Sequence, residues 1–212
     1  MSKNYNRKDH LYKKAKQSGY RSRAAYKLLE LNNKHKLFRR GSRILDLGCF
    51  PGGWIQVAAE FAGPGGLILG IDLTELEPIK TSNPLTDLPK IDIFIGDLKE
   101  EDTKNRIRTE YPGAFDTILS DMSPKLTGIK DRDQVATTEL FQLALDYCSD
   151  FLKPGGNFVC KVFPGNETED TFKEARKNFR TISRTNLDSS RASSNEIYVI
   201  GKGFQGNTFK NE

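Results

Sequence analysis

A lysine stands inside one of the most apolar stretches of this chain. Lys161 interrupts the run FVCKVF at residues 158–163. Buried lysines are rare in proteins, although an edge strand whose lysine reaches solvent would explain this one as well. A desolvated lysine beside another cation loses its proton more readily and can then accept one from a weak acid. Lys161 is therefore a candidate general base, and Lys27 is a candidate for the second cation.

Acidic residues end four successive apolar runs of the chain. They are Asp46, Asp72, Asp97 and Asp121. Each one alone is explained by capping of the next helix. The carboxyl ends of parallel strands meet at one edge of a sheet, however, and ligands bind there. Together the four acids describe a site for a nucleoside that carries a positive charge, with Asp72 placed to bind ribose hydroxyls and Asp97 an adenine amino group.

A glycine-rich turn connects the first of these runs to a predicted helix. Residues 44–54 read ILDLGCFPGGW, with Gly48 followed by Gly52 and Gly53. The spacing differs from GxGxxG, and no P-loop lysine follows, so a dinucleotide or ATP fits this turn less well than a less phosphorylated nucleotide. An ordinary strand-to-helix turn is the alternative for this run alone. Asp72 follows Gly53 at about the spacing of a ribose-binding acid, and this favours the nucleotide.

Strand and helix patterns alternate along the chain and would position these residues. We predict strands at residues 44–47, 67–71, 91–95, 117–119, 157–162 and 196–200, and helices at residues 22–32, 53–61, 99–110, 135–152 and 168–179. Ser22 is the expected N-cap of the first helix. Such alternation predicts βαβ units and a mostly parallel sheet with helices on both faces. Residues 1–16 show no clean periodicity.

Charge divides the chain into two unequal parts. Residues 1–43 carry fourteen Lys and Arg against Asp9 and Glu30, whereas the remainder has nineteen against twenty-six acidic residues. Five aromatic side chains interleave with the basic ones at positions 5, 12, 20, 26 and 38, as in surfaces on which nucleic-acid bases stack. A solvated basic tail is the alternative. The pattern favours nucleic acid as the partner.

Length and composition exclude several classes of protein. A chain of 212 residues suits one domain. No apolar stretch approaches ~18 residues and the first residues lack an apolar leader, so we expect neither a membrane protein nor a secreted one. Three scattered cysteines, at positions 49, 148 and 160, argue against a disulfide framework and structural zinc. We therefore expect a cytoplasmic protein without a metal.

Several motifs in order resemble the FtsJ/RrmJ-type family of S-adenosylmethionine-dependent RNA ribose 2′-O-methyltransferases. They are SGYRSRAAYKL at residues 18–28, DLG at 46–48, PGGW at 51–54, LSDMSP at 119–124, KVF at 161–163, SSRA at 189–192 and EIY at 196–198. The resemblance covers nearly the whole chain. It departs from the family at Cys49 and Phe50, where small residues are usual, so the shape of the cofactor pocket is expected to differ slightly.

The resemblance implies a catalytic tetrad of Lys27, Asp121, Lys161 and Glu196. A ribose 2′-hydroxyl is a very weak acid, and Lys161 would accept its proton as the oxygen attacks the methyl group. Asp121 and Glu196 would orient the Lys161 amine, while Lys27 would position the ribose and offset the developing negative charge. This chemistry requires no metal because the sulfonium is already an activated electrophile.

The resemblance also implies the cofactor, S-adenosyl-L-methionine, and its contacts. These are Gly52, Trp54, Asp72, Asp97 and Asp121. The expected RNA-backbone contacts are Lys125, Arg191, Arg21, Arg23, Arg39 and Arg40. Binding to RNA should weaken as salt rises.

The implied fold is a doubly wound α/β domain of the class I S-adenosylmethionine methyltransferase type, which is Rossmann-like. It has seven strands, mostly parallel, with an antiparallel last strand. We expect a basic N-terminal arm and helix at residues 1–40 as the RNA platform, the methyltransferase domain at 41–206 and a tail at 207–212. A monomer is expected.

The motifs leave the RNA target open. Compact members of the family modify a uridine of 23S rRNA within the large ribosomal subunit, and this is the expected substrate. Relatives that methylate anticodon-loop riboses of tRNA share the same motifs. Three rival functions are a non-catalytic ribosome-assembly protein that binds RNA, an NAD-dependent oxidoreductase and a small-molecule O-methyltransferase. The complete tetrad argues against the first, the glycine spacing against the second and the basic arm against the third.

Overall fold

Seven strands form one sheet in the computed structural model, which describes residues 10–79, 88–124, 127–128, 130–190 and 194–206. The strands are β1 (Arg43–Leu47), β2 (Leu67–Asp72), β3 (Lys90–Ile95), β4 (Phe115–Ser120), β5 (Leu152–Val162), β6 (Phe179–Thr185) and β7 (Ile197–Phe204). The helices are α1 (His10–Gln17), α2 (Ala24–His35), α3 (Gly53–Ala62), α4 (Glu101–Glu110), α5 (Lys130–Phe151) and α6 (Asn166–Ala175), and a 3-10 turn, η1, spans Arg176–Asn178.

The strand order in space is β3-β2-β1-β4-β5-β7-β6. The first five strands in this order are parallel. β7 runs antiparallel to both β5 and β6. The chain winds outward in one direction from β1 to β3 and in the other from β4, so the order reverses between β1 and β4, where doubly wound sheets bind ligands. The predicted α/β fold with an antiparallel last strand is confirmed.

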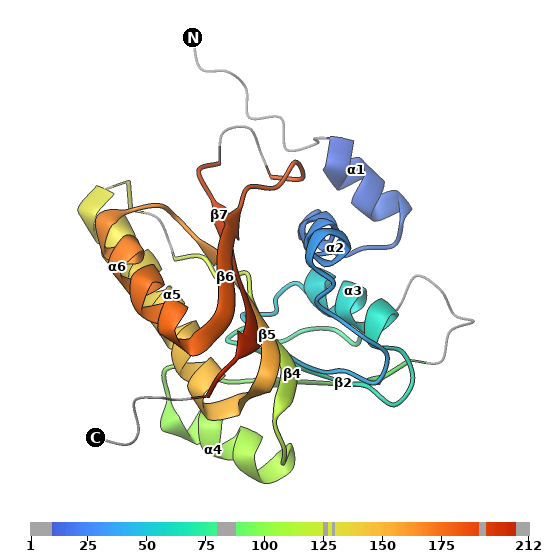
Figure 1. Ribbon diagram of the computed structural model, residues 1–212. Coiled ribbons are helices and arrows are strands. Elements are labelled where there is room, and N and C mark those ends of the chain that lie inside the picture. The colour runs from blue at the N-terminus through green and yellow to red at the C-terminus, as the bar shows by residue number, and fades with distance from the viewer. Residues whose placement is uncertain (1–9, 80–87, 125–126, 129, 191–193, 207–212) are drawn as a thin grey trace.

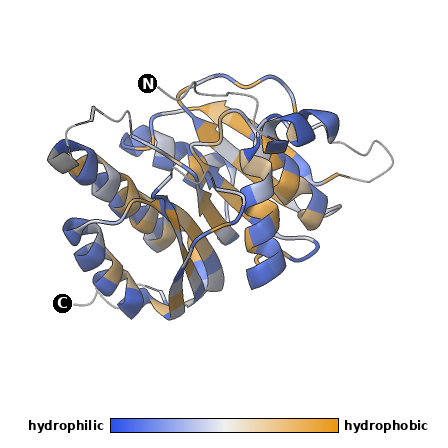
Figure 2. Cartoon of the chain, turned by 90° about the horizontal axis from the view of Figure 1, so that it is seen from above, coloured by the Kyte–Doolittle hydropathy of each residue, from blue (hydrophilic) through white to orange (hydrophobic). Residues whose placement is uncertain are grey.

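Helices cover both faces of the sheet (Figure 1). The sheet therefore divides the hydrophobic core into two layers. Side chains alternate across each strand. On β1, Leu45 and Leu47 join the cluster beneath α4, α5 and α6, whereas Ile44 joins the cluster beneath α2 and α3. Figure 2 shows the hydrophobic strands between helices whose outer surfaces are hydrophilic. Alternation places Asp46 on the α2–α3 face, among apolar neighbours.

Part of the predicted basic arm, the helix α2, packs on the face of the sheet that α3 also covers. Ala25, Leu28 and Leu31 of α2 are fully buried in the same cluster as α3. The boundary between the arm and the methyltransferase domain stays a prediction. Among the described helices, none has both the length and the apolar character needed to cross a bilayer.

Three local predictions were wrong. The helix expected at residues 168–179 ends at Ala175, and Phe179 begins β6, a strand whose mostly exposed side chains form no apolar run. α2 begins at Ala24 after Arg23, without a side-chain cap, so Ser22 is not its N-cap. α1 lies in a stretch where no helix was predicted.

Candidate active site

The alternation of side chains brings Lys161 and Asp121 to one face of the sheet. On β5, Val159 belongs to the cluster beneath α2 and α3, so Lys161, two residues later, points to the same side. Leu119 of β4 lies in this cluster too, and Asp121 follows it at the same interval. α2 crosses this face and carries Lys27. The predicted tetrad therefore meets at the carboxyl ends of β4 and β5.

Lys161 is almost completely buried and contacts Asp121 twice. Its side chain is 8% exposed, and Nζ lies 2.6 Å from the main-chain oxygen of Asp121 and 3.2 Å from its Oδ1. The edge-strand alternative is wrong, because β5 lies between β4 and β7. The lysine is held by two oxygens of one residue at the edge of the sheet where ligands bind.

Tyr198 of β7 connects the two halves of the tetrad. Its hydroxyl donates to Asp121 Oδ1 at 2.8 Å, and the Lys27 ammonium lies 5.6 Å from its ring centroid. Burial raises the pKa of Tyr198, and the charges of Asp121 and Glu196 raise it further. The phenol therefore stays protonated and acts as a donor. The sequence did not single out Tyr198, although its position two residues after Glu196 places both on one face.

The second pair of the tetrad is also nearly buried. Lys27 Nζ and Glu196 Oε1 are 2.5 Å apart, with side chains 12% and 10% exposed. Ser190 donates to the same oxygen at 2.7 Å. Burial by itself raises the pKa of Glu196, but the hydrogen bonds from Lys27 and Ser190 and the charges of Lys27 and Lys161 outweigh it and lower the pKa. Glu196 is therefore a carboxylate at neutral pH.

The loop that carries Ser190 is tied to α2. Glu30 accepts hydrogen bonds from the main-chain nitrogens of Asp188 and Ser189 and from the Ser189 hydroxyl. Arg23 Nη2 donates to the Ser189 carbonyl at 2.6 Å. These contacts fix the loop relative to the helix that presents Lys27.

The glycine loop between β1 and α3 bends where only glycine is unstrained. Gly48 and Gly52 have φ of +73° and +100°. A Cβ on Gly48 would overlap Met122, which follows β4, and one on Gly52 would overlap Ile79. The two glycines therefore allow the loop to approach Met122 and Ile79 closely.

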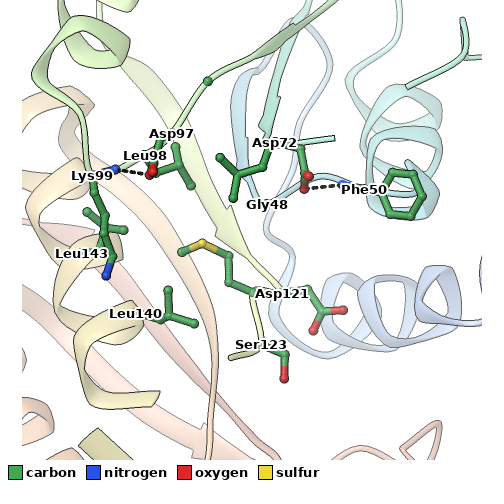
Figure 3. Close-up of a pocket in the computed structure, with 13 residues that line it drawn as sticks. Gly48, Phe50, Asp72, Asp97, Leu98, Lys99, Asp121, Ser123, Leu140 and Leu143 are labelled. Carbon is green, nitrogen blue, oxygen red and sulfur yellow. Dashed lines mark hydrogen bonds between the residues drawn. The ribbon is translucent and has the colours of Figure 1, made fainter. Parts of the chain in front are cut away.

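A cavity of about 580 Å³ opens over these strand ends. Figure 3 shows Asp72 and Asp97 on its upper edge, Asp121 and Ser123 on its lower edge, and Leu143 at the far side from Asp72. Asp72 accepts hydrogen bonds from the main-chain nitrogens of Phe50 and Thr74. Each of its oxygens keeps a further lone pair for a ligand hydroxyl. The mixture of carboxylates and apolar side chains suits a nucleoside.

A smaller cavity of about 140 Å³ adjoins the glycine loop and α2. Asp46 and Ser22 border it, and the buried Oδ2 and Oγ atoms of these residues have no hydrogen-bond partner among the described residues. Burial raises the pKa of Asp46 well above its ordinary value, and the charges of Asp121 and Asp72 add to this. Buried polar atoms are usually paired. This cavity therefore suits the polar end of a ligand with hydrogen-bond donors and a positive charge.

The other predicted cofactor contacts lie close to these cavities. Trp54 is buried, borders the smaller cavity and donates its indole N–H to the Ala24 carbonyl at 2.9 Å. Gly52 is on the same loop, but a Cβ at this position would point at Arg21 and Ile79. Gly52 is not among the described residues that line either cavity. No three His, Cys, Asp or Glu side chains gather as a metal site in the part of the chain that the structure covers.

The predicted RNA contacts divide between two places. Arg21 and Arg23 lie beside the active-site loops, where they donate to the carbonyls of Pro78 and Ser189. Arg39 instead pairs with Asp116 at the start of β4. Arg40 is exposed near Gly63 of the α3 C-terminus. Lys125 and Arg191 fall outside the described residues.

Comparison with known families decides the assignment. The family model described as FtsJ-like methyltransferase matches residues 20–204. The chain belongs to the FtsJ-like methyltransferase family. Relatives of this FtsJ-like protein include the "Ribosomal RNA large subunit methyltransferase E" of Methanothrix thermoacetophila, which is 42% identical over 195 residues, 92% of this chain and 72% of the relative. The protein of that name from Methanothermobacter thermautotrophicus is 40% identical, over 94% of this chain and 92% of its own.

Solved structures agree with the assignment to the FtsJ-like family. A Plasmodium falciparum protein described as a ribosomal RNA methyltransferase has a TM-score of 0.73 and 29% identity, covering 89% of this chain and 100% of that one. Fibrillarin from Aeropyrum pernix, solved with natively bound S-adenosyl-L-methionine, has a TM-score of 0.58 and 17% identity. The match covers 87% of this chain and 76% of that one and shows a likeness of fold. The predicted family, fold and S-adenosylmethionine cofactor are confirmed.

Proposed function

We propose that this FtsJ-like methyltransferase transfers a methyl group from S-adenosylmethionine to the 2′-hydroxyl of a ribose in large-subunit ribosomal RNA. The observation that carries the proposal is the nearly buried Lys161 amine, held against Asp121 beside a nucleoside-sized cavity. The names of the relatives support ribosomal RNA as the substrate. The specific target that we propose is a uridine of 23S rRNA in the assembled subunit.

Lys161 is the proposed proton acceptor. A neutral amine has two N–H donors and one lone pair, and the two Asp121 oxygens near Nζ can take both donors. The lone pair then remains for the 2′-hydroxyl proton, which would pass to Nζ as the ribose oxygen bonds to the methyl carbon. The methyl–sulfur bond would break at the same time, and its electron pair would stay on the sulfur. Lys161 afterwards releases the proton to solvent.

Asp121 and the Lys27–Glu196 pair are proposed to position the reacting groups. Asp121 is held by Tyr198 and in turn holds Lys161. Lys27 is fixed by Glu196, so its ammonium can bind the ribose and offset the negative charge that develops on the oxygen. A nearly buried pair keeps this charge in place without reorganisation.

The proposed cofactor contacts follow the two cavities. Asp72 would accept the ribose hydroxyls and Asp97 the adenine amino group in the larger cavity, where Asp121 also lies. Trp54 and Asp46, whose Oδ2 lacks a partner among the described residues, would meet the methionine end in the smaller one. Gly52 would contribute to cofactor binding through the bend that it gives the loop. When bound, S-adenosylmethionine supplies an activated methyl group on a sulfonium.

The basic residues near the N-terminus are proposed to bind the RNA backbone. Arg21 and Arg23 lie beside the active-site loops. Residues 1–40 would form the RNA platform beside a methyltransferase domain at 41–206, and the chain would act as a monomer on ribosomes in the cytoplasm. Light scattering of the purified protein tests the oligomeric state.

The test of the substrate is to map the methylated nucleotide. The protein is incubated with tritiated S-adenosylmethionine and, separately, with large ribosomal subunits, free ribosomal RNA and bulk tRNA from a strain lacking the gene. We expect labelled 2′-O-methyluridine in the large subunit, and none with Lys161→Ala. Label in tRNA would instead assign the protein to anticodon-loop methylation. Cofactor binding without label in any RNA would favour the non-catalytic assembly protein.

A further inference from the structure

Phe50 is an exposed aromatic side chain at the junction of the two cavities. It lies on the glycine loop, is 54% exposed and borders both the 580 Å³ and the 140 Å³ cavity. Single exposed apolar side chains are common and need no explanation by themselves. This one lies where the two cavities meet.

The Phe50 ring faces outward from the cofactor cavity. Its main-chain nitrogen donates to Asp72 Oδ2 at 3.0 Å, which fixes the backbone of the loop at this point. Figure 3 shows the ring turned away from Asp72 and from Leu98 and Leu143 at the far side of the cavity. Cofactor bound along Asp72 and Asp97 therefore leaves a face of the ring open to solvent.

Phe50 shares the smaller cavity with a residue of the proposed tetrad. Asp121 borders the smaller cavity together with Phe50, and Lys161 Nζ is 3.2 Å from Asp121 Oδ1. An RNA ribose that reaches Lys161 must bring its flanking nucleotides past the rim of this cavity.

Two arginines lie near the loop that carries Phe50. Arg21 lies against the next residues of the loop, with Nη1 3.4 Å from the Pro51 carbonyl oxygen and Cδ 3.3 Å from the Cβ position of Gly52. Arg23 borders the smaller cavity on its α2 side. Aromatic faces between cations that follow the backbone are the usual means of binding single-stranded nucleic acid.

We propose that Phe50 is a positioning residue on which a base adjacent to the methylated nucleotide stacks. The inference rests on the proposed RNA substrate. A phenyl ring has no hydrogen-bonding group, so the stacking holds the strand in register without selecting a base. It adds to the affinity for RNA and leaves cofactor affinity unchanged.

Affinities for two strands separate stacking from phosphate binding. The dissociation constants of a fluorescein-labelled 12-nucleotide oligouridylate and of an abasic 12-nucleotide ribose phosphate strand are measured by anisotropy, with S-adenosylhomocysteine present. We expect Phe50→Ala to weaken oligouridylate binding at least about fivefold, the low end of base stacking on one aromatic. Binding of the abasic strand should change less than about twofold.

Variants and a second readout exclude other roles for the ring. Phe50→Tyr should restore oligouridylate binding and Phe50→Leu should not. Ile95→Ala removes an apolar side chain that is 57% exposed and lines neither cavity, and it should change nothing. Cofactor affinity, read from the fluorescence of Trp54, the only tryptophan of the chain, should stay within about twofold in Phe50→Ala.

Three results would overturn the inference. One is equal loss of affinity for both strands in Phe50→Ala, and another is loss of cofactor affinity with RNA binding intact, which would make Phe50 a cover for the cofactor. The third is a wild type with no preference for oligouridylate over the abasic strand. A failure of the proposed function would be seen in a different experiment, as no ribose methylation of large subunits by the wild type. It is therefore distinguishable from a failure of the Phe50 inference.

Discussion

The same two strands carry an acid and a lysine at both of their ends. At the start of β4 and β5, Asp116 pairs with Lys153, and at their carboxyl ends Asp121, which follows β4, pairs with Lys161 of β5. The residue types and the parallel neighbours are identical. The surroundings of the two pairs are different.

The Asp116 carboxylate is held by three donors of its own protein. It accepts hydrogen bonds from the Arg43 main-chain nitrogen, from the exposed Arg39 guanidinium and from Lys153, whose side chain is 33% exposed. Burial alone raises the pKa of Asp116, but these donors outweigh it and lower the pKa. The cluster ties the connection between α2 and β1 to β4 and β5.

At the other end the lysine is more deeply buried, and a carboxyl group beside the pair lacks one hydrogen bond within the described part of the chain. Lys161 is 8% exposed, and the neighbouring Asp46 keeps a buried oxygen without a partner among the described residues. The carboxyl ends of strands at the reversal of strand order also open to a cavity. The burial of the lysine and the Asp46 oxygen that has no partner in the residues the structure describes, rather than the presence of an acid–lysine pair, therefore distinguish the proposed reactive end.

The largest expected effect separates the two lysines. Lys161→Ala should lower the rate of methyl transfer about 10²- to 10⁴-fold, the usual contribution of a general base, with cofactor binding retained. Lys153→Ala should leave the rate within about twofold, because Asp116 keeps its other donors. Single-turnover transfer of tritiated methyl to large subunits measures both. Similar rates in the two variants would refute the distinction.

Removing a proposed cofactor contact should have the next largest effect. Asp72→Ala should weaken S-adenosylmethionine binding about 10- to 100-fold, as expected for hydrogen bonds to a charged acceptor. Asp116→Ala should leave cofactor affinity unchanged because Asp116 lies at the opposite end of β4. Calorimetric titration gives both affinities. Normal affinity in Asp72→Ala would remove Asp72 from the site.

Lowering the pH should reveal a smaller effect on the stability of the folded chain, from one carboxylate at each end of the β4–β5 pair. The pKa of Glu196 is below its ordinary value of 4.5 and that of Asp116 is below 3.8, so each carboxylate stabilises the folded chain above these values. The stabilisation is lost as pH falls through the lower folded pKa of each group. Glu196→Gln and Asp116→Asn should each flatten the decline in urea unfolding midpoint between about pH 5 and pH 2.

Activity should distinguish these two acid variants. Glu196→Gln should reduce methyl transfer at pH 7, whereas Asp116→Asn should not. An acid-induced decline as steep in both variants as in the wild type would show that neither carboxylate is linked to folding.

The smallest expected effect concerns the exposed Arg39. Its side chain is 73% exposed, so Arg39→Ala should change stability by less than about 1 kcal/mol. If the start of β4 also contacts the RNA backbone, the slope of log affinity against log salt should fall by about 0.7 for one lost contact to a single strand. Anisotropy at several salt concentrations measures the slope. An unchanged slope would confine RNA binding to the active-site end.

The sequence predicted those parts of the molecule that have a strong local signal. Apolar runs marked six strands, and β6 was missed because its exposed edge gives it no such run. The period of two along β4 and β5 is enough to bring Asp121 and Lys161 to one face. The resemblance was needed to place Lys27 in the tetrad, because a lysine on a basic helix has no distinguishing local pattern. It assigned Glu196 to the Lys161 amine, and the pairing of Glu196 with Lys27 is seen only in the structure.

Other site residues could not be found from the pattern. Tyr198 lies in an apolar strand, where an aromatic reads as core, and its hydrogen bond to Asp121 depends on tertiary contact. Ser190 acts through a side-chain contact to Glu196 across a loop, and Glu30 through a contact to Ser189, which is far from it in the sequence. Asp46 was recognised as a strand-end acid, but only the structure reveals that its buried oxygen lacks a partner among the described residues.

The most direct test is a crystal structure with S-adenosylhomocysteine and a short uridine-containing RNA. The account predicts a uridine whose 2′-oxygen lies within about 3 Å of Lys161 Nζ, the reach of a general base. A 2′-oxygen held by another side chain, or RNA bound only at the Asp116 end of the strands, would contradict it.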